Sequence, residues 1–224
     1  MRRAAAGVVL GLSVAVGAPV AWQVTEEPVA AGASVERALS APVPPSVPSG
    51  EGPAVAPAST LPPVTVRDAA PAATAPAPVP VRLAVPALGI EAPVDPVGVR
   101  GDGQMALPDD VDRVGWYRFG PAPGTAGSTV LAGHVDDRDQ GLGVLAPLRD
   151  AAVGDRIEVI DAAGAATGWR VVSRDVIEKR ALPLDQLFGR AGPPRLVLLT
   201  CGGPFLPDLG AYRDNVVVVA EPLP

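Results

Sequence analysis

The chain is organised around the stretch Arg195-Leu196-Val197-Leu198-Leu199-Thr200-Cys201-Gly202-Gly203. It begins with a continuous apolar run, which is typical of a buried strand. Cys201 is the only cysteine among the 224 residues, and a lone cysteine at the end of such a strand is most often a small buried hydrophobic residue. Two features favour a catalytic role instead. Gly202 and Gly203 free the backbone beside the sulfur for close approach by a substrate, and Thr200 is polar where a core strand would continue with Val or Leu.

Two other strand-like runs adjoin residues with useful chemistry. The run 128–133 ends at His134, the only histidine, and Arg213 opens the run 214–220. A free thiol with a pKa near 8.5 is only a few per cent thiolate at neutral pH, so a cysteine nucleophile needs a proton partner, and His134 is the one candidate. An arginine stays charged and donates several hydrogen bonds, so Arg213 is a candidate for oxyanion stabilisation. A surface histidine and a solvated arginine remain the alternatives.

Composition excludes several classes of protein. The formal net charge of −6 argues against a nucleic-acid binder, which would need a basic face. One cysteine rules out an intrachain disulfide, and one cysteine with one histidine makes a zinc site improbable. We therefore expect no metal and no cofactor. Aromatic residues make up only 4%, so the core must rest on Val, Leu, Ile and Ala.

The folded domain is expected to span residues 79–224. Its short apolar runs are separated by Gly- and Pro-containing turns, and the run 155–161 alternates with period two as a half-buried strand should. This pattern predicts an all-β fold, a closed or nearly closed β-barrel of seven to eight strands with short helices. The expected strands are 81–86, 90–94, 115–119, 128–134, 155–161, 168–177, 195–201 and 214–220, and the expected helical turns are 144–149 and 183–188.

Two segments precede this domain. In residues 1–25, Arg2 and Arg3 are followed by an apolar run from Ala4 to Trp22, which predicts a hydrophobic helix that serves as a membrane anchor or a signal segment. Either one would place the rest of the chain outside the cytoplasm. Residues 26–78 form a Pro/Ala-rich linker. Twelve of the forty residues from 41 to 80 are proline, so this part should be disordered and extended, a spacer or a stalk.

Three motifs in order resemble those of sortases. They are Leu131-Ala132-Gly133-His134-Val135-Asp136, Leu199-Thr200-Cys201-Gly202-Gly203 and Tyr212-Arg213-Asp214-Asn215-Val216-Val217, with the arginine twelve residues after the cysteine. The Cys-Gly-Gly and Tyr-Arg-Asp-Asn forms are most similar to the class F sortases of actinobacteria. The resemblance covers about residues 79–221. One departure is Val197, where the sortase strand often has Thr, and we expect a packing change there rather than a loss of chemistry.

The resemblance implies a cysteine transpeptidase on a closed β-barrel. Such an enzyme cleaves a C-terminal sorting signal of the Leu-Pro-x-Thr-Gly kind after Thr, holds the product as a thioester and transfers it to an amine of the cell wall or a pilus. Carried over, Cys201 is the nucleophile, His134 the acid/base and Arg213 the residue that stabilises the oxyanion, while Thr200 lines the substrate pocket. The implied partners are surface proteins with a sorting signal, an amine acceptor of peptidoglycan precursor or pilin, and the cell membrane. The implied location is extracytoplasmic on a single membrane span.

Two other functions fit parts of this pattern. One is an unrelated exported cysteine peptidase or an L,D-transpeptidase, although the latter usually has its histidine close to the cysteine, and here the only histidine lies 67 residues upstream. The other is a non-catalytic binding module of the cell surface on the same barrel. Cleavage of a sorting-signal peptide distinguishes the enzyme from the module, and loss of cleavage on changing Cys201 assigns the nucleophile.

Overall fold

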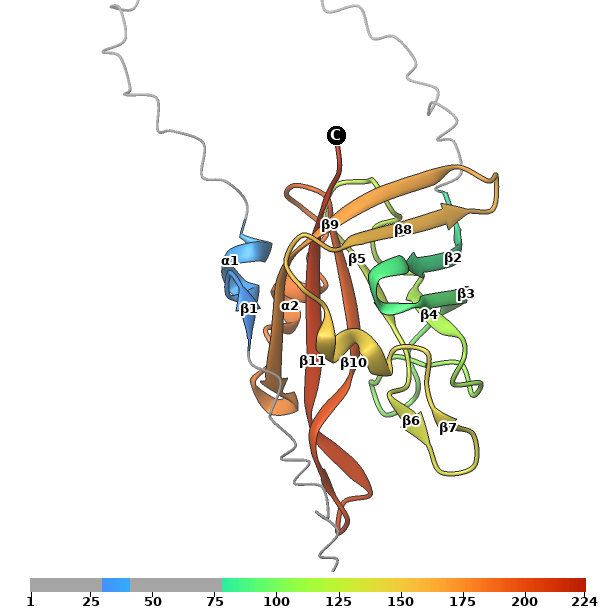
Figure 1. Cartoon of the computed structure of the whole chain (residues 1–224), viewed down its shortest axis with the longest axis vertical. Coiled ribbons are helices and arrows are strands. Elements are labelled where there is room, and N and C mark those ends of the chain that lie inside the picture. The colour runs from blue at the N-terminus through green and yellow to red at the C-terminus, as the bar shows by residue number, and fades with distance from the viewer. Residues whose placement is uncertain (1–29, 41–77) are drawn as a thin grey trace, which may run out of the picture.

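The structure, a computed structural model, describes residues 30–40 and 78–224. The expected N-terminal hydrophobic helix and most of the Pro/Ala-rich linker lie outside these residues. Eight strands form the barrel in the order β8-β2-β3-β4-β5-β10-β11-β9, and pairing of β9 with β8 closes it (Figure 1). The all-β class and the closed barrel of seven to eight strands are thus confirmed. The barrel strands are β2 (Pro80–Val85), β3 (Ile90–Val97), β4 (Val114–Tyr117), β5 (Ser128–Ala132), β8 (Arg156–Asp161), β9 (Ala166–Glu178), β10 (Arg195–Leu206) and β11 (Ala211–Pro222).

Short elements connect and cover the barrel. Strands β6 (Asp136–Asp137) and β7 (Gly141–Leu142) form a small hairpin directly after His134. The helical turns η1 (Pro86–Leu88), η2 (Ala146–Asp150) and η3 (Lys179–Ala181) and the helix α2 (Leu184–Leu187) lie between strands, and η2 and α2 occupy the two regions expected to be helical. Within residues 30–40 and 78–224, no helix is long and apolar enough to cross a membrane.

Strands β10 and β11 are buried on both faces. Leu196, Leu198, Val216 and Val218 point into the barrel core, whereas Val197, Val217 and Val219 belong to a second apolar cluster on the outer face. A strand that is covered on both faces needs apolar residues at every position, not at alternate ones. This explains why the sequence reads as continuous apolar runs just before Cys201 and after Asn215.

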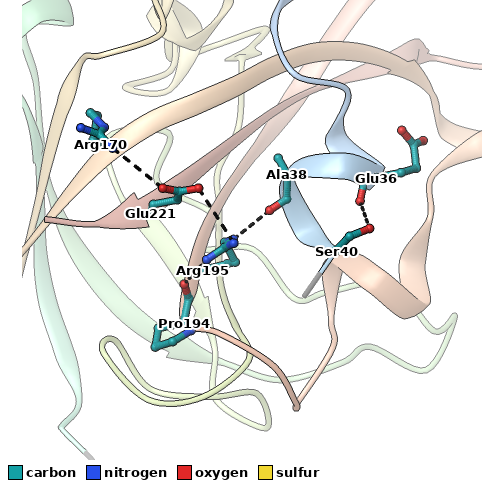
Figure 2. Close-up of polar contacts among 7 residues, drawn as sticks. All are labelled: Glu36, Ala38, Ser40, Arg170, Pro194, Arg195 and Glu221. Atoms are coloured by element: carbon teal, nitrogen blue, oxygen red, sulfur yellow. Dashed lines mark hydrogen bonds and ion pairs between the residues drawn. The ribbon is translucent and has the colours of Figure 1, made fainter. Parts of the chain in front are cut away.

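The outer cluster is covered in part by a segment from the expected linker. Strand β1 (Ala31–Gly32) pairs with β9, and helix α1 (Val35–Leu39) follows with Ser34 as its N-cap. Val35 is fully buried and Ala38 nearly so. Figure 2 shows Arg195, the first residue of β10, beside this helix: its Nε donates to the Ala38 carbonyl at 2.8 Å, and its Nη2 lies 3.9 Å from Glu221. Residues 31–39 therefore pack on the barrel as part of the folded unit.

The two strands that carry the candidate site run further than the sequence predicts. Cys201 and Arg213 were expected at strand ends, but β10 continues to Leu206 and β11 begins at Ala211. The strand signal is lost there because Gly202, Gly203 and Pro204 interrupt it, and the register shifts between Gly202 and Phe205. The result is a long β10–β11 hairpin that extends beyond the barrel (Figure 1).

Candidate active site

Two of the three candidate catalytic residues, Cys201 and Arg213, lie on the neighbouring strands β10 and β11, and His134 lies in the segment that follows β5. Cys201 is half-buried on β10 and stands opposite Asn215 of β11, two residues from Arg213. On its other side β10 runs parallel to β5, with Leu199 opposite Ala132. The Gly133 N–H donates to the Leu199 carbonyl at 3.1 Å, so this register continues beyond β5 toward His134. The topology thus brings Cys201 between the segments that carry His134 and Arg213.

Thr200 joins the cysteine strand to the histidine segment. Its side chain is buried, and Oγ1 donates to the Gly133 carbonyl at 3.0 Å. Because Gly133 directly precedes His134, this bond fixes the backbone on which the imidazole is mounted. Thr200 therefore has a structural role, to hold the segment before His134, that the sequence did not reveal. Its role in lining a substrate pocket stays a prediction.

His134 has a defined partner on one ring nitrogen. Nε2 lies 3.1 Å from the Pro108 carbonyl oxygen. A carbonyl only accepts, so Nε2 carries the hydrogen in this contact and Nδ1 is left to gain or lose a proton. The segment that carries Pro108 is itself anchored, because Arg113 donates from Nε and Nη2 to both carboxylate oxygens of Asp95 on β3, at 2.6 and 2.5 Å. These hydrogen bonds hold the pKa of Asp95 below its usual value.

The guanidinium of Arg213 is oriented by its neighbour. Nε and Nη2 donate to the two carboxylate oxygens of Asp214, each at 2.8 Å, and the Asp214 side chain is only 6% exposed. Such a fork holds the guanidinium plane more firmly than a single contact would. The positive charge stays accessible, because the Arg213 side chain is 44% exposed. Sequence reasoning missed Asp214, although it lies inside one of the quoted motifs.

The two glycines after the cysteine make room for β11. A Cβ on Gly203, which has φ +68°, would meet Asp214 Oδ2 at 2.1 Å, and one on Gly202 would meet Val216 Cγ2 at 2.8 Å. The sequence interpretation was that these glycines open the backbone to a substrate. The structure adds that they allow the Asp214 carboxylate and the Val216 methyl groups to pack against the chain just beyond Cys201.

The aspartates after His134 have internal partners. Asp136 accepts a hydrogen bond from the Tyr212 hydroxyl at 2.5 Å, and Asp137 accepts from the backbone N–H groups of Asp139 and Gln140. Those backbone hydrogen bonds lower the pKa of Asp137. Within the part of the chain that the structure describes, no three His, Cys, Asp or Glu side chains group in a way that would hold a metal ion. Asp136 and Asp137 thus shape the loop.

Fold and site together define an eight-stranded β-barrel with a cysteine, a histidine and an arginine gathered at one end. A sequence model of the Sortase domain matches residues 83–223. The chain therefore belongs to the sortase family, the cysteine transpeptidases whose general substrates are sorting signals and amine acceptors.

Solved structures agree with this fold. Sortase C1 from Streptococcus suis has 18% sequence identity and a TM-score of 0.50 over 65% of this chain and 74% of that chain. A lid mutant of sortase A from Corynebacterium diphtheriae has 18% identity and a TM-score of 0.50 over 67% of this chain and 73% of that one. At such identities the likeness establishes the fold alone. No curated protein sequence matches the chain.

Proposed function

We propose that the protein is an exported sortase that cleaves a Leu-Pro-x-Thr-Gly-like sorting signal through a thioester on Cys201 and transfers the product to an amine of the cell surface. The observation that supports this proposal is that β10, which carries Cys201, pairs with β5 on one side and β11 on the other. Strand β5 leads to His134, and β11 carries Arg213. The Cys-Gly-Gly and Tyr-Arg-Asp-Asn motifs make class F the subgroup that we propose.

The first half of the reaction breaks the Thr–Gly peptide bond. The Cys201 thiolate attacks the Thr carbonyl carbon, and the negative charge that develops on the carbonyl oxygen is stabilised by the guanidinium of Arg213, whose plane Asp214 holds. When the C–N bond breaks, protonated His134 gives its Nδ1 proton to the leaving Gly amine. The products are a thioester on Cys201 and a peptide with a free amino terminus.

The second half forms the new bond. The acceptor amine attacks the thioester carbonyl, His134 takes a proton from that amine, and collapse of the intermediate releases the Cys201 thiolate. A new amide then joins the sorted protein to its acceptor. Because Nε2 of His134 already donates to the Pro108 carbonyl, Nδ1 can cycle between its two protonation states without loss of that contact.

The location that we propose follows from the N-terminal sequence. Residues 1–25 have the charge and hydropathy of a single membrane span with the charged end inside. The barrel would then face the extracytoplasmic side, where sorting-signal proteins and peptidoglycan precursor or pilin amines occur. Fusion of a reporter to the C-terminus, followed by protease treatment of intact cells, tests this orientation.

The experiment for the activity uses the full-length chain with a fluorogenic Leu-Pro-x-Thr-Gly peptide library, with and without an amine acceptor, read by mass spectrometry. Cleavage after Thr and appearance of the amide product support the proposal. Cleavage without transfer to any amine would make the protein a peptidase, and absence of cleavage across the library would favour the binding module.

A further inference from the structure

The two residues that precede the candidate catalytic residues on β10 and β11 both hold the segment around His134. Thr200, before Cys201, donates to the Gly133 carbonyl at 3.0 Å. Tyr212, before Arg213, donates from its hydroxyl to Asp136 Oδ2 at 2.5 Å. His134 thus lies between two anchor points, one residue before it and two residues after it, that are both supplied by the β10–β11 hairpin.

Asp136 belongs to a β-hairpin that is held by several hydrogen bonds. Asp136 begins β6 and pairs with Leu142 of β7. Asp137 Oδ1 accepts from the backbone N–H groups of Asp139 and Gln140 at 2.9 and 3.1 Å, which closes the turn of this hairpin. The Gly143 N–H donates to the Val135 carbonyl at 2.9 Å. The hydrogen bond to the Asp136 carboxylate therefore restrains the backbone that carries His134 as well.

The Tyr212 side is fixed as well. Its ring packs edge-on against Phe205, with centroids 5.2 Å apart and an interplanar angle of 70°. The hydrogen bond to the Asp136 carboxylate, burial, and the charges of Asp136 and Cys201 raise the pKa of Tyr212 to about 12, while Arg149 of η2 acts in the opposite direction. The hydroxyl therefore stays a proton donor over the whole neutral range.

We propose that Tyr212 and Asp136 are positioning residues that hold the His134 segment against β11 and so set the placement of His134 relative to Cys201. This rests on the proposed function, in which Cys201 forms the thioester and His134 transfers protons to and from the substrate amines. The bond within the pair joins two side chains other than the imidazole. It acts through the two-residue connection from Asp136 to His134, as Thr200 acts through Gly133 on the other side.

The kinetic test compares Tyr212→Phe, Asp136→Ala and the double variant in the full-length chain. Each single change removes a hydrogen bond to a charged carboxylate and is expected to lower kcat by about tenfold or more, with KM within about twofold. Because both changes remove the same bond, the double variant should be no slower than the slower single one. Asp136→Asn keeps an acceptor oxygen and should recover most of kcat.

Tyr117→Phe is the matched control, since Tyr117 is the only other tyrosine of the chain and packs on Phe119 and Phe188. This variant should keep the original kcat. A Tyr212→Phe enzyme as active as Tyr117→Phe would overturn the proposal, and so would independent, additive losses in the double variant. Thermal unfolding of every variant shows whether a loss reflects misfolding.

A second measurement does not depend on the sorting reaction. In chain labelled with ¹³C at the tyrosine Cζ, the Tyr212 signal is assigned by its persistence in Tyr117→Phe. Its titration midpoint should lie near pH 12 and fall toward the ordinary value near 10 in Asp136→Ala. The rate at which iodoacetamide alkylates Cys201 should change its pH dependence in Tyr212→Phe and not in Tyr117→Phe.

These readouts separate failure of the inference from failure of the proposed function. If no sorting peptide is cleaved but the Tyr212 titration and the Cys201 alkylation profile respond as expected, the positioning pair stands and the assigned substrate is wrong. A Tyr212 midpoint near 10, unchanged in Asp136→Ala, would show that the bond is absent and would refute the inference even in an active enzyme.

Discussion

Arg213 and Asp214 form a two-point ion pair between adjacent residues of one strand, with Nε and Nη2 of the arginine each 2.8 Å from a carboxylate oxygen of the aspartate. Neighbours on a strand normally point to opposite faces, so this pairing requires both side chains to turn toward a common edge. The space that permits it is supplied by Gly203, whose missing Cβ would stand 2.1 Å from Asp214 Oδ2.

Removing the carboxylate should impair the reaction without abolishing it. Asp214→Ala leaves the Arg213 charge but not its fixed plane, so we expect kcat/KM to fall by about 10–100-fold, less than the roughly 10²–10³-fold that loss of an oxyanion donor causes. Arg213→Lys, which cannot form the fork, should approach the larger loss. Steady-state kinetics on the sorting peptide measures both. Asp208→Ala, an exposed change in the hairpin turn, is the control, and equal activity of Asp214→Ala and Asp208→Ala would contradict this role.

Gly203 and Gly210 give a matched pair of substitutions. Both have positive φ, +68° and +57°, but nothing lies within 4 Å of a Cβ at Gly210. Alanine at Gly210 should destabilise by about 1–2 kcal/mol through backbone strain alone. Alanine at Gly203 adds a collision with Asp214, so we expect a larger drop in unfolding free energy and at least a tenfold fall in kcat/KM. Denaturant unfolding and peptide cleavage test this, and identical behaviour of the two variants would argue against it.

The hydroxyl group of Thr200 should contribute more to stability and to kcat than the volume of its side chain does. Thr200→Val keeps the shape but leaves the Gly133 carbonyl without its side-chain donor in a buried place, which costs about 1–3 kcal/mol of unfolding free energy. Because Gly133 precedes His134, kcat should fall as well, while Thr200→Ser, which restores a donor, should recover both. If Thr200 mainly lines the substrate pocket, Thr200→Val would instead raise KM and leave the unfolding midpoint unchanged.

The packed segment 31–39 should contribute to stability. Val35→Ala removes buried methyl groups between α1 and the barrel, and we expect a loss of about 1–3 kcal/mol in unfolding free energy. Glu36→Ala, on the exposed side of the same helix, should change little. A Val35→Ala chain that unfolds like Glu36→Ala in thermal denaturation would show that this helix does not pack on the barrel in solution.

The position of α1 also changes how the proline-rich sequence is understood. Residues 41–77 connect Ser40, at the end of α1, to Pro78, before β2, so both ends of this segment attach to the same folded unit. Its length therefore does not set the distance between the N-terminal hydrophobic segment and the barrel. That distance is limited by residues 23–29, at most about 25 Å when fully extended.

Much of the fold was predictable because strand patterns are local. The apolar runs before Cys201 and after Asn215 lie in strands, and the alternating run 155–161 coincides with β8 except at Asp155. The helix α1 was missed as part of the domain because its buried face consists of only Val35 and Ala38. Pairing of β1 with β9 joins residues some 140 positions apart, which no local pattern reports.

The site divides in the same way. Cys201, His134 and Arg213 could be proposed because each is chemically distinctive and two of them are unique in the chain. The hydrogen bonds that hold the His134 segment could not be predicted, because each joins residues far apart in the sequence. Thr200 and Gly133 are 67 residues apart, and Tyr212 and Asp136 are 76 residues apart. Only the parallel register of β5 with β10, followed by the β11 pairing, brings these residues together.

The most direct measurement of the central claim is the intact and peptide mass of the full-length protein after rapid quenching with a sorting-signal peptide. The account predicts a covalent adduct with the mass of the peptide up to Thr, on the fragment that contains Cys201, sensitive to hydroxylamine and absent from Cys201→Ala. In His134→Ala, which keeps the thiol but lacks the acid that protonates the leaving amine, the adduct should form far more slowly. Cleavage by Cys201→Ala at the original rate, or an adduct on a different residue, would contradict it.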